Sequence, residues 1–386
     1  MFLQRNRFAR SGRIARSSRR PRGNLVTQRP IRVLLIAPSL DIVGGHSVQA
    51  KSLLGILRDV PDVQIDFLAI NPKLPGPLRF LQRVKYLKTI VTSGTYFCQL
   101  MLRAWRYDIV HSFSAANYSF LLSAAPAVLV ARLYGKKSIV NYHDGRARQH
   151  LAEWRSSCLM RLADRIVTPS EYLVDVFAEF GYTAQPIYNV IEADRFRFRV
   201  RRPVRPVFLH NRSFEELYNV PCSLKAFGLV QQRYTDARLT LAHDGPLRAQ
   251  LEQMVAALGL RNVTFVGTLP PSDLPNLYDA ADIYFTSPNI DNMPLSLLEC
   301  YASGVPVVAT KAGGIPYIAA DNQTALLVDL NDHEAMARAA FRLLEEDSLA
   351  ESLALSARAQ CNRYTAAAVR EAWLKLYREL CPLRDL

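Results

Sequence analysis

The stretch DNMPLSLLECYASGVPVVATKAGGIPY, from Asp291 to Tyr317, says most about the architecture of this chain. A helix is expected to begin near Pro294, because proline suits a first helical turn, and Glu299 then lies about one and a half turns in. An apolar run predicts a buried strand at Val305–Ala309, and two adjacent glycines follow it. Helix, buried strand and glycine turn in succession are typical of a parallel α/β sheet.

The same alternation of strands and helices fills the chain on both sides of this stretch. Short runs that are apolar at every position indicate strands buried on both faces. Between two sets of such strands, the Arg- and Pro-rich segment Phe196–Pro206 has no helical period and is interpreted as a linker. The expected strands are Ile31–Pro38, Val63–Ile70, Asp108–Phe113, Ser138–His143, Arg165–Pro169, Val207–Leu209, Arg238–Ala242, Val263–Val266, Ile283–Phe285, Val305–Ala309 and Ala325–Val328, and the expected closing helices are Asp332–Glu346 and Ala366–Leu380.

The pattern predicts an α/β protein with two doubly wound, Rossmann-like parallel-sheet domains that face each other across a cleft. We divide the chain into a basic tail at residues 1–30, an N-terminal domain at 31–200, a C-terminal domain at 201–365 and a last helical segment at 366–386. A length of 386 residues makes two domains the default expectation.

Positive charge is concentrated at the start of the chain. Residues 1–30 hold nine arginines and no acid, so the rest of the chain carries about +5 of the net charge of +14. We interpret the tail as disordered and solvated, with binding to anionic lipid and an organellar transit peptide as the two alternatives. Its few aromatic residues, Phe2 and Phe8, give little support for stacking on nucleic-acid bases, so no nucleic-acid partner is expected.

Residues 73–106 form a second basic region, in which seven Lys and Arg side chains alternate with aromatic and aliphatic ones and no acid occurs. This mixture fits a helix lying on a membrane surface and fits equally a core-facing helix with a solvated basic face. The six cysteines are scattered without metal-ligand spacing, as is typical of free thiols in a reducing compartment. We therefore expect a cytoplasmic protein, with peripheral contact to the inner face of an anionic membrane as an open alternative.

Polar groups gather where the chain leaves the predicted strands, and ligands of doubly wound sheets bind there. The carboxylates of Asp291 and Glu299 can accept hydrogen bonds from vicinal hydroxyls. The first N–H groups of the helix, near Met293, Leu295 and Ser296, point towards an anion. The combination predicts a pocket for a molecule that carries both hydroxyls and phosphates.

Further candidates follow other strands. The turns Gly44-Gly45 and Gly313-Gly314 let backbone approach a ligand closely, and Arg212 at a strand end suits phosphate. His143 ends a strand on the N-terminal side of the cleft. The sequence GGHSVQ is not the G-x-G-x-x-G of nicotinamide cofactors. Plain turns, a structural histidine and an interdomain salt bridge are the alternative roles for these positions.

With these residues the chain resembles glycosyltransferase family 4 (glycosyl transferases group 1), whose members have the GT-B architecture. The resemblance covers about residues 31–380 and is most specific over Ser287–Val328, with its acid-x7-acid motif. The segments LAHDGPLRAQLE at Leu241–Glu252 and VTFVGTL at Val263–Leu269 support it.

The resemblance implies a role for each residue of the C-terminal motif. Glu299 would bind the ribose of a nucleotide-sugar donor, and Asp291 would hold hydroxyls of the donor sugar. The backbone N–H groups of Met293, Leu295 and Ser296 would bind the sugar and the diphosphate. The C-terminal domain would thus bind the donor, and the N-terminal domain the acceptor.

The resemblance also implies roles around this motif. Gly45 would lie against the diphosphate, His143 near the transferred sugar, and Arg212 against the leaving phosphates. Segment 366–386 would cross back to the N-terminal domain. With no aspartate-rich motif in the sequence, we expect neither a metal nor another cofactor, and the nucleotide sugar is a substrate.

The sequence departs from the family pattern at three places. The first acid is Asp291 rather than glutamate, Tyr218 falls near the position of a frequent lysine, and His243-Asp244-Gly245 replaces G-x-G. Neutralisation of the diphosphate would rest mainly on Arg212, with Lys311 as a weaker candidate. An inactive homologue therefore stays among the alternatives.

Taken together, these features predict a retaining, hexosyltransferase-type enzyme that moves a sugar to an acceptor hydroxyl on a glycan or a lipid-linked molecule. Surface polysaccharide or glycolipid assembly is the expected setting. The alternatives are a GT-B-like epimerase or phosphorylase of sugar nucleotides, or a non-enzymatic basic binding protein.

Overall fold

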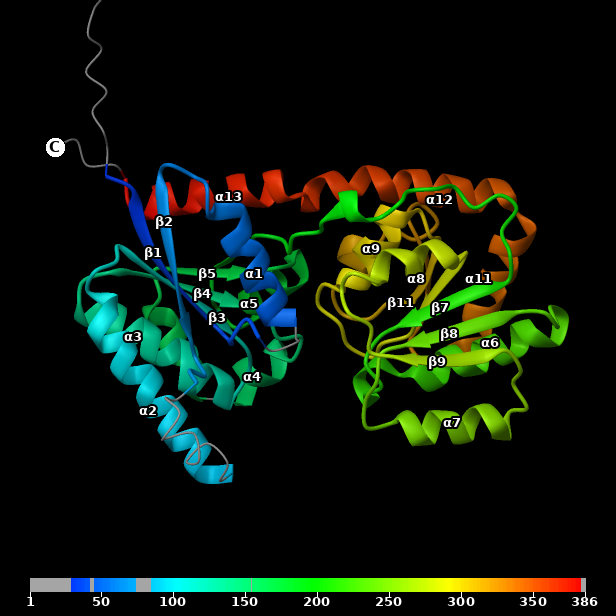
Figure 1. Cartoon of the computed structure of the whole chain (residues 1–386), viewed down its shortest axis with the longest axis horizontal. Helices are drawn as coiled ribbons and strands as arrows, with labels where there is room; N and C mark the ends of the chain where they lie inside the picture. Colours follow the sequence, from blue (N-terminus) through cyan, green and yellow to red (C-terminus); the bar gives the residue numbers. More distant parts are fainter. Residues whose placement is uncertain (1–28, 42–44, 74–84, 154, 383–386) are drawn as a thin grey trace, which may run out of the picture.

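The computed structural model describes residues 29–41, 45–73, 85–153 and 155–382, which form two α/β halves side by side (Figure 1). Of the basic tail predicted at residues 1–30, residues 1–28 lie outside the described residues, as do Gly44 and part of the second basic region. Each half is built on a six-stranded parallel sheet with helices on both faces.

The sheet of the N-terminal half has the strand order β2-β1-β3-β4-β5-β6, and every neighbouring pair is parallel. Its side chains alternate between two buried faces, as in β1, where Val33 and Leu35 face α1 and α13 while Leu34 and Ile36 face α2 and α3. The strands are β1 Ile31–Ala37, β2 Val63–Ala69, β3 Ile109–Ser114, β4 Lys137–Tyr142, β5 Arg165–Thr168 and β6 Ala184–Pro186, and the helices of this half are α1 Gly45–Leu57, α2 Lys85–Ala104, α3 Ala125–Leu133, α4 Ala147–Glu153 and α5 Glu171–Glu179.

The sheet of the C-terminal half has the order β12-β11-β10-β7-β8-β9, again with parallel neighbours throughout. Its strands are β7 Val207–Asn211, β8 Arg238–Ala242, β9 Val263–Gly267, β10 Ile283–Thr286, β11 Val307–Thr310 and β12 Leu326–Val328. Its helices are α6 Val220–Arg233, α7 Arg248–Ala257, α8 Leu274–Ala280, α9 Leu295–Ser303, α10 Ile315–Ile318, α11 His333–Glu345 and α12 Asp347–Gln360. The described residues also contain short 3-10 or π turns, at Phe120–Ala124, Arg155–Leu162, Ala193–Arg195, Glu216–Tyr218 and Cys361–Tyr364.

The last helix, α13 (Ala366–Leu380), packs on the first half although the segment before it belongs to the second. Thr365 caps its N-terminus by accepting a hydrogen bond from the Ala368 N–H at 3.3 Å. Trp373 and Tyr377 bury their rings between this helix and the N-terminal sheet. In Figure 1, α12 and α13 run along one edge of both halves and connect them.

The predicted architecture of two doubly wound parallel sheets is confirmed, and the expected strands lie close to the observed ones. Strand β11 begins at Val307 and not at Val305, because Val305 still donates to Cys300 O in the turn after α9 and Pro306 has no N–H for the ladder. The short strand β6 and the helix α12 were missed.

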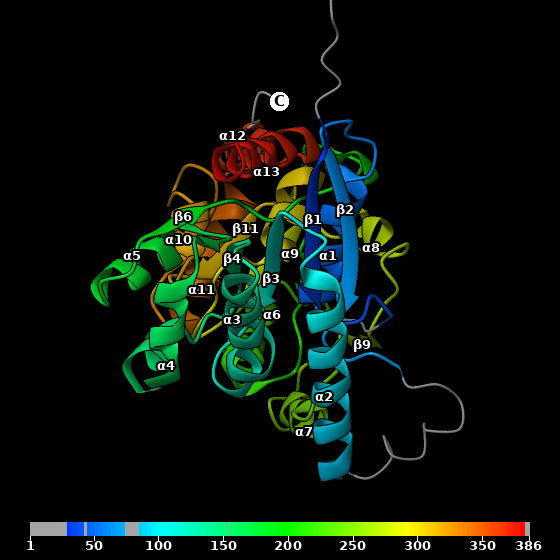
Figure 2. The same ribbon diagram turned by 90° about the vertical axis from the view of Figure 1, so that its left-hand side faces the viewer.

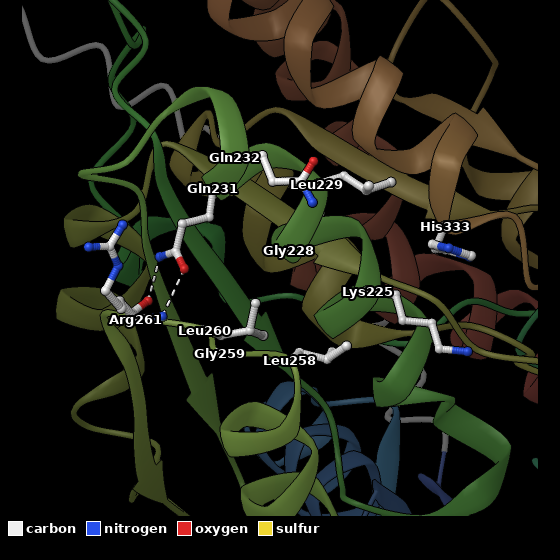
Figure 3. A pocket seen from close by; sticks show the side chains of 10 residues that line it. All are labelled: Lys225, Gly228, Leu229, Gln231, Gln232, Leu258, Gly259, Leu260, Arg261 and His333. Carbon is white, nitrogen blue, oxygen red and sulfur yellow. Dashed lines mark hydrogen bonds between the residues drawn. The ribbon is translucent and has the colours of Figure 1, made fainter.

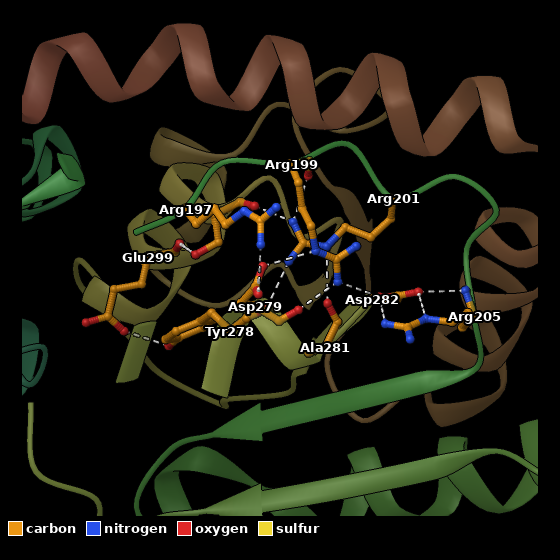
Figure 4. A network of polar contacts seen from close by, with 10 residues as sticks. Arg197, Arg199, Arg201, Arg205, Tyr278, Asp279, Ala281, Asp282 and Glu299 are labelled. Carbon is orange, nitrogen blue, oxygen red and sulfur yellow. Dashed lines mark hydrogen bonds and ion pairs between the residues drawn. The ribbon is translucent and has the colours of Figure 1, made fainter. Parts of the chain in front are cut away.

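The arginine-rich segment interpreted as a linker is held firmly on the C-terminal half (Figure 4). Arg201 is 1% exposed and donates to the carbonyl oxygens of Tyr278 at 2.9 Å and Ala281 at 3.1 Å. Arg205 and Arg199 pair with the buried Asp282 at 2.8 and 3.1 Å. Carbonyl groups at the end of α8 and one buried carboxylate thus fix the segment against this half.

Candidate functional site

The acid-x7-acid motif forms a loop and the start of helix α9, beyond the carboxyl end of β10. Asp291 lies in the loop, and its Oδ1 accepts from the backbone N–H of Asn292 at 2.8 Å. The helix begins at Leu295 with Pro294 as its N-cap, one residue later than predicted. The N–H groups of Leu295 and Ser296 therefore have no acceptor within the helix, which is the arrangement that favours an anion.

An ion pair lies directly in front of this helix start. Arg212, just after β7, donates from Nη2 to Asp291 Oδ2 at 2.5 Å and from Nη1 to Ser296 Oγ at 3.5 Å. The guanidinium also lies over the ring of Tyr218 at 4.2 Å. Burial raises the pKa of the Asp291 carboxyl and Arg212 offsets part of that rise, while the Asp291 carboxylate raises the pKa of Arg212 against the effect of burial.

The Arg212 side chain still has an unused donor. Its Nε is buried and has no hydrogen-bond partner among the described residues. Because an unmade hydrogen bond of a buried charged group is costly, this nitrogen favours an incoming acceptor such as a phosphate oxygen. Tyr218, at the position of the frequent family lysine, provides a ring for the guanidinium and no second cation.

Glu299 is tied to a tyrosine on a neighbouring helix (Figure 4). Its Oε2 accepts from the hydroxyl of Tyr278 at 2.6 Å, and that hydroxyl accepts from Asn211 Nδ2 at 3.0 Å. Burial raises the pKa of the Glu299 carboxyl, and the tyrosine hydrogen bond opposes the rise. The second oxygen of Glu299 makes no hydrogen bond within the described part of the chain, and it can accept from a ligand hydroxyl.

The Gly313-Gly314 turn lies against the acidic loop. A Cβ on Gly314 would stand 1.9 Å from Asn292 O, and one on Gly313, with φ of +48°, would stand 2.2 Å from Asp291 O. The Gly314 N–H donates to Asp291 O at 2.9 Å. These glycines therefore let two stretches of backbone touch, which is a closer reason for their presence than contact with a ligand.

On the N-terminal half, His143 directly follows β4 and lies two residues before Gly145. Its Nε2 contacts Asn141 Oδ1 at 2.8 Å, and its ring stacks on Phe113 at 4.9 Å between centroids. His46, on the first turn of α1 beside Gly45, lies 5.5 Å away between ring centroids. Burial lowers the pKa of His143 well below its usual value, so the imidazole is neutral at pH 7.

The loops that carry His143 and Asp291 meet across the cleft. A Cβ on Gly145 would lie 3.8 Å from Ile290 Cγ1 and 3.9 Å from Asn292 Cβ. Ser170, the N-cap of α5, hydrogen-bonds Asn292 Oδ1 from the other side. The structure thus brings the predicted residues of both halves to one place, and their roles there stay predictions.

Two points from the sequence remain, namely the role of Lys311 and the question of metal ligands. Lys311 pairs with Asp329 at 3.0 Å on the surface, and both side chains are well exposed. Among the residues that the structure describes, no group of three or more His, Cys, Asp or Glu side chains is arranged to hold a metal ion.

A cavity of about 460 Å³ lies elsewhere on the C-terminal half (Figure 3). It opens between α6 and the segment after α7, with Gly228, Leu260 and His333 among its lining residues. None of the predicted site residues lines it. We therefore assign the candidate site to the cleft and not to this cavity.

Sequence reasoning missed four residues of the cluster. Tyr278 lies on α8 and Asn211 ends β7, and only the tertiary fold brings them to Glu299. His46 directly follows the Gly44-Gly45 turn, and this position was its one available signal. Asn292 stands inside the motif itself, between Asp291 and the helix.

Solved structures with the same arrangement include two from cyanobacteria. HepE of Anabaena, solved in complex with UDP-glucose, has a TM-score of 0.72 and 16% identity, and the match covers 90% of this chain and 100% of that one. Sucrose-phosphate synthase of Thermosynechococcus elongatus has a TM-score of 0.72 and 18% identity, covering 92% of this chain and 100% of its own. These likenesses confirm the GT-B fold.

Curated relatives are similar over parts of their sequences. A D-inositol 3-phosphate glycosyltransferase of Corynebacterium urealyticum is 33% identical over 165 residues, which are 41% of this chain and 39% of the relative. An alpha-D-kanosaminyltransferase of Streptomyces kanamyceticus is 23% identical over 69% of this chain and 75% of its own. The chain thus spans well under half of the first of these relatives.

Two family models match consecutive parts of the chain. The model "Glycosyltransferase Family 4" matches residues 24–195, and the model "Glycosyl transferases group 1" matches residues 192–360. The two matches follow each other in the order of the two sheets. The chain therefore belongs to the GT-B glycosyltransferases of group 1 and family 4.

Proposed function

We propose that this chain is a retaining hexosyltransferase that moves a sugar from a nucleoside diphosphate to an acceptor hydroxyl. The observation that carries the proposal is the cluster at the start of α9. There Arg212 pairs with Asp291 in front of the first turn of the helix that carries Glu299, and the loop just after His143 lies against the Asp291 loop. Uridine diphosphate is the first nucleotide to test, because HepE was solved with UDP-glucose.

The proposed binding mode uses each group according to its chemistry. Glu299, with one oxygen engaged by Tyr278, accepts a ribose hydroxyl on the other, and Asp291 accepts a sugar hydroxyl. The diphosphate lies against the N–H groups of Leu295 and Ser296 and against the unused Nε of Arg212. Gly45, where an added Cβ would meet nothing within 4 Å, leaves room on the N-terminal side.

In the proposed reaction, the bond between the sugar C1 and the diphosphate oxygen breaks, and a bond from C1 to the acceptor oxygen forms on the same face. The acceptor proton passes to the leaving diphosphate. The carboxylates at the site support this route over one with an enzyme nucleophile, because each is engaged by another side chain. Asp291 is paired with Arg212, Glu299 with Tyr278, and Asp144 with Arg146 at 3.0 Å. Helix N–H groups and Arg212 would stabilise the leaving group without a metal ion.

The test measures donor binding and product formation by the full chain. UDP and UDP-hexoses should raise the unfolding temperature, and free UDP should accumulate when an acceptor is present. Glu299→Gln should weaken donor binding about tenfold to a hundredfold, because it removes a charge-assisted hydrogen bond to the ribose. The matched control is Glu334→Gln at an exposed glutamate, which should bind like the parent.

Other outcomes would favour the alternatives. A UDP-sugar converted to another UDP-sugar without release of UDP indicates an epimerase, and a sugar phosphate formed from inorganic phosphate indicates a phosphorylase. If nucleoside diphosphates and their sugars all leave the unfolding temperature unchanged, the transferase proposal fails.

The acceptor is proposed to be a glycan or lipid-linked molecule at a membrane, for surface polysaccharide or glycolipid assembly. From Lys73 to His143 the sequence has one acid, Asp108, and Arg29 pairs with it at 2.9 Å. Helices α2 and α3 contact each other on the outside of the N-terminal half (Figure 2). The exposed apolar side chains on and directly after these helices include Ile90, Phe97, Leu102, Trp105, Leu129 and Leu133.

This surface combines exposed apolar groups with an excess of positive charge, which suits an anionic lipid surface, although Lys73 pairs with Asp41 and Lys137 with Asp164. Among the described residues, no helix is long and apolar enough to cross a membrane. The double variant Ile90→Ser/Leu102→Ser should lower co-sedimentation with phosphatidylglycerol vesicles about tenfold or more, because about 70% of each side chain is exposed in the parent. Leu355→Ser, at an exposed leucine of the other half, should change nothing, and equal loss in both variants would contradict the proposal.

A further inference from the structure

A chain of buried polar side chains leads from the last helix to His143. The hydroxyl of Tyr377 on α13 lies 2.8 Å from His111 Nδ1, and His111 Nε2 lies 3.2 Å from Asn141 Nδ2. Asn141 Oδ1 then lies 2.8 Å from His143 Nε2. Tyr377 and His111 are fully buried, and Asn141 is 2% exposed.

The sheet itself aligns these groups. His111 and Asn141 stand on the neighbouring parallel strands β3 and β4, where Phe113 pairs in register with Asn141. His111 and Phe113 lie on the face of the sheet that α13 covers. Asn141 of β4, and His143 two residues later, lie on the same face. Trp373 lies on the His111 ring at 4.5 Å between centroids, so α13 shields this row of polar side chains from solvent.

In this structure the Asn141 amide nitrogen faces His111 and the amide oxygen faces His143. Its nitrogen can only donate, so His111 Nε2 accepts. Burial lowers the pKa of His111 to about 3, so the neutral ring carries its one proton on Nδ1 and donates it to the Tyr377 oxygen. The Asn141 oxygen can only accept, so the proton of neutral His143 lies on Nε2.

The consequence is an unprotonated ring nitrogen on His143. His143 Nδ1 carries no proton, and it makes no hydrogen bond within the described part of the chain. We propose that Tyr377, His111 and Asn141 are positioning residues that hold His143 in the Nε2–H tautomer, so that Nδ1 accepts a hydrogen bond from a hydroxyl of the transferred sugar. The contact with the sugar rests on the proposed function, whereas the tautomer does not.

This arrangement suits a reaction in which positive charge develops on the sugar. A protonated imidazole beside that charge would oppose it, and a neutral acceptor does not. The two histidines, joined through one amide, keep each other neutral, because protonation of either would leave two donors facing each other or a donor without an acceptor. The helix that crosses back between the halves thus specifies the chemistry of a residue in the cleft.

The test reads the tautomers directly in the full chain labelled with ¹⁵N-histidine. Long-range ¹H–¹⁵N correlation spectra should show the proton of His143 on Nε2 and that of His111 on Nδ1, and signals are assigned by loss in His143→Gln and His111→Gln. Tyr377→Phe removes the acceptor of the His111 proton, so His111 should change to the Nε2–H form, the amide should turn round, and His143 should change to Nδ1–H. Tyr301→Phe, which loses a buried hydroxyl in the other half, is the matched control and should leave both rings unchanged.

A second variant covers the case in which Tyr377→Phe does not fold. In Asn141→Asp, the carboxylate accepts from both rings, so His111 should change to Nε2–H while His143 keeps its tautomer and its pKa rises. Turnover in Tyr377→Phe should fall about tenfold with the KM for the donor unchanged, because one hydrogen bond in the reacting complex is lost.

The outcomes separate the two proposals. His143 found as Nδ1–H in the parent, or unchanged tautomers in Tyr377→Phe, would overturn the positioning role. The predicted tautomers in a protein that binds no sugar nucleotide would uphold that role while the transferase proposal fails.

Discussion

Replacing Arg212 with methionine should lower the free energy of unfolding by about 3–5 kcal/mol and the rate of sugar transfer by about 10²–10³-fold. The stability loss follows because Asp291, 9% exposed at its side chain, would keep a buried charge without its partner at 2.5 Å. The rate loss follows because the leaving diphosphate would lose its guanidinium. Denaturant unfolding and a UDP-release assay measure the two effects.

The pH dependence of this deficit has a definite sign. Without Arg212 the folded-state pKa of Asp291 rises further above that of the unfolded chain. The deficit should therefore be full above the folded pKa and should shrink as the pH falls through it, since a protonated carboxyl needs no cation.

A double variant separates stability from transfer. Arg212→Met/Asp291→Asn removes both charges, so it should recover most of the lost stability, while transfer stays low because the guanidinium is still missing. Recovery of transfer in the double variant would show that Arg212 acts only by neutralising Asp291, contrary to its proposed role at the diphosphate.

Replacing Gly314 with alanine should destabilise the protein by about 1–3 kcal/mol and weaken transfer about 10²-fold. The new Cβ would stand 1.9 Å from Asn292 O, which is backbone and cannot rotate away. The loop with Asp291 must therefore shift, and it would lose the hydrogen bond that its oxygen accepts from Gly314 N at 2.9 Å. Denaturant unfolding and a UDP-release assay measure these losses, and calorimetric titration shows whether UDP binding weakens as well.

The matched control for this variant is Gly55→Ala in the helix α1. An added Cβ there meets nothing within 4 Å, so alanine should stabilise the helix by about 0.5–1 kcal/mol and leave UDP binding unchanged. Normal UDP binding in Gly314→Ala would mean that the acidic loop is not part of the donor site.

The fold could be predicted because its strands are short and apolar at every position. The run IRVLLIA, buried on both faces, is an example that leaves few alternatives to a parallel sheet. The three-residue strand β6 was missed because Ala184, Gln185 and Pro186 have no apolar period and lie at the edge of the sheet. The linker reading of Phe196–Pro206 could not show that its arginines are held by Asp282 and helix carbonyls, since those partners lie about 80 residues away.

The candidate site could be predicted where its residues follow strands. Asp291, Arg212 and His143 all come at such positions, and the fold gathers them at one cleft. The glycine pair was expected to face a ligand, but its spacing carries no information on the backbone at Asn292 that it touches. Tyr278 and Tyr377 lie on helices of ordinary pattern, so their hydroxyl contacts depend wholly on tertiary packing.

The clamp that Arg201 and Arg205 form on the C-terminal half limits where the molecule can bend. Because that segment is fixed to its half, bending is limited to two short segments between the halves, Ile187–Ile191 and Cys361–Tyr364. These segments are joined by a hydrogen bond from Ile191 N to Tyr364 O at 2.9 Å. Rotation about this paired pivot would separate Ser170 from Asn292 and Asp175 from Tyr317. Any opening of the cleft by bending at this pair of segments would therefore break both of these contacts between the halves.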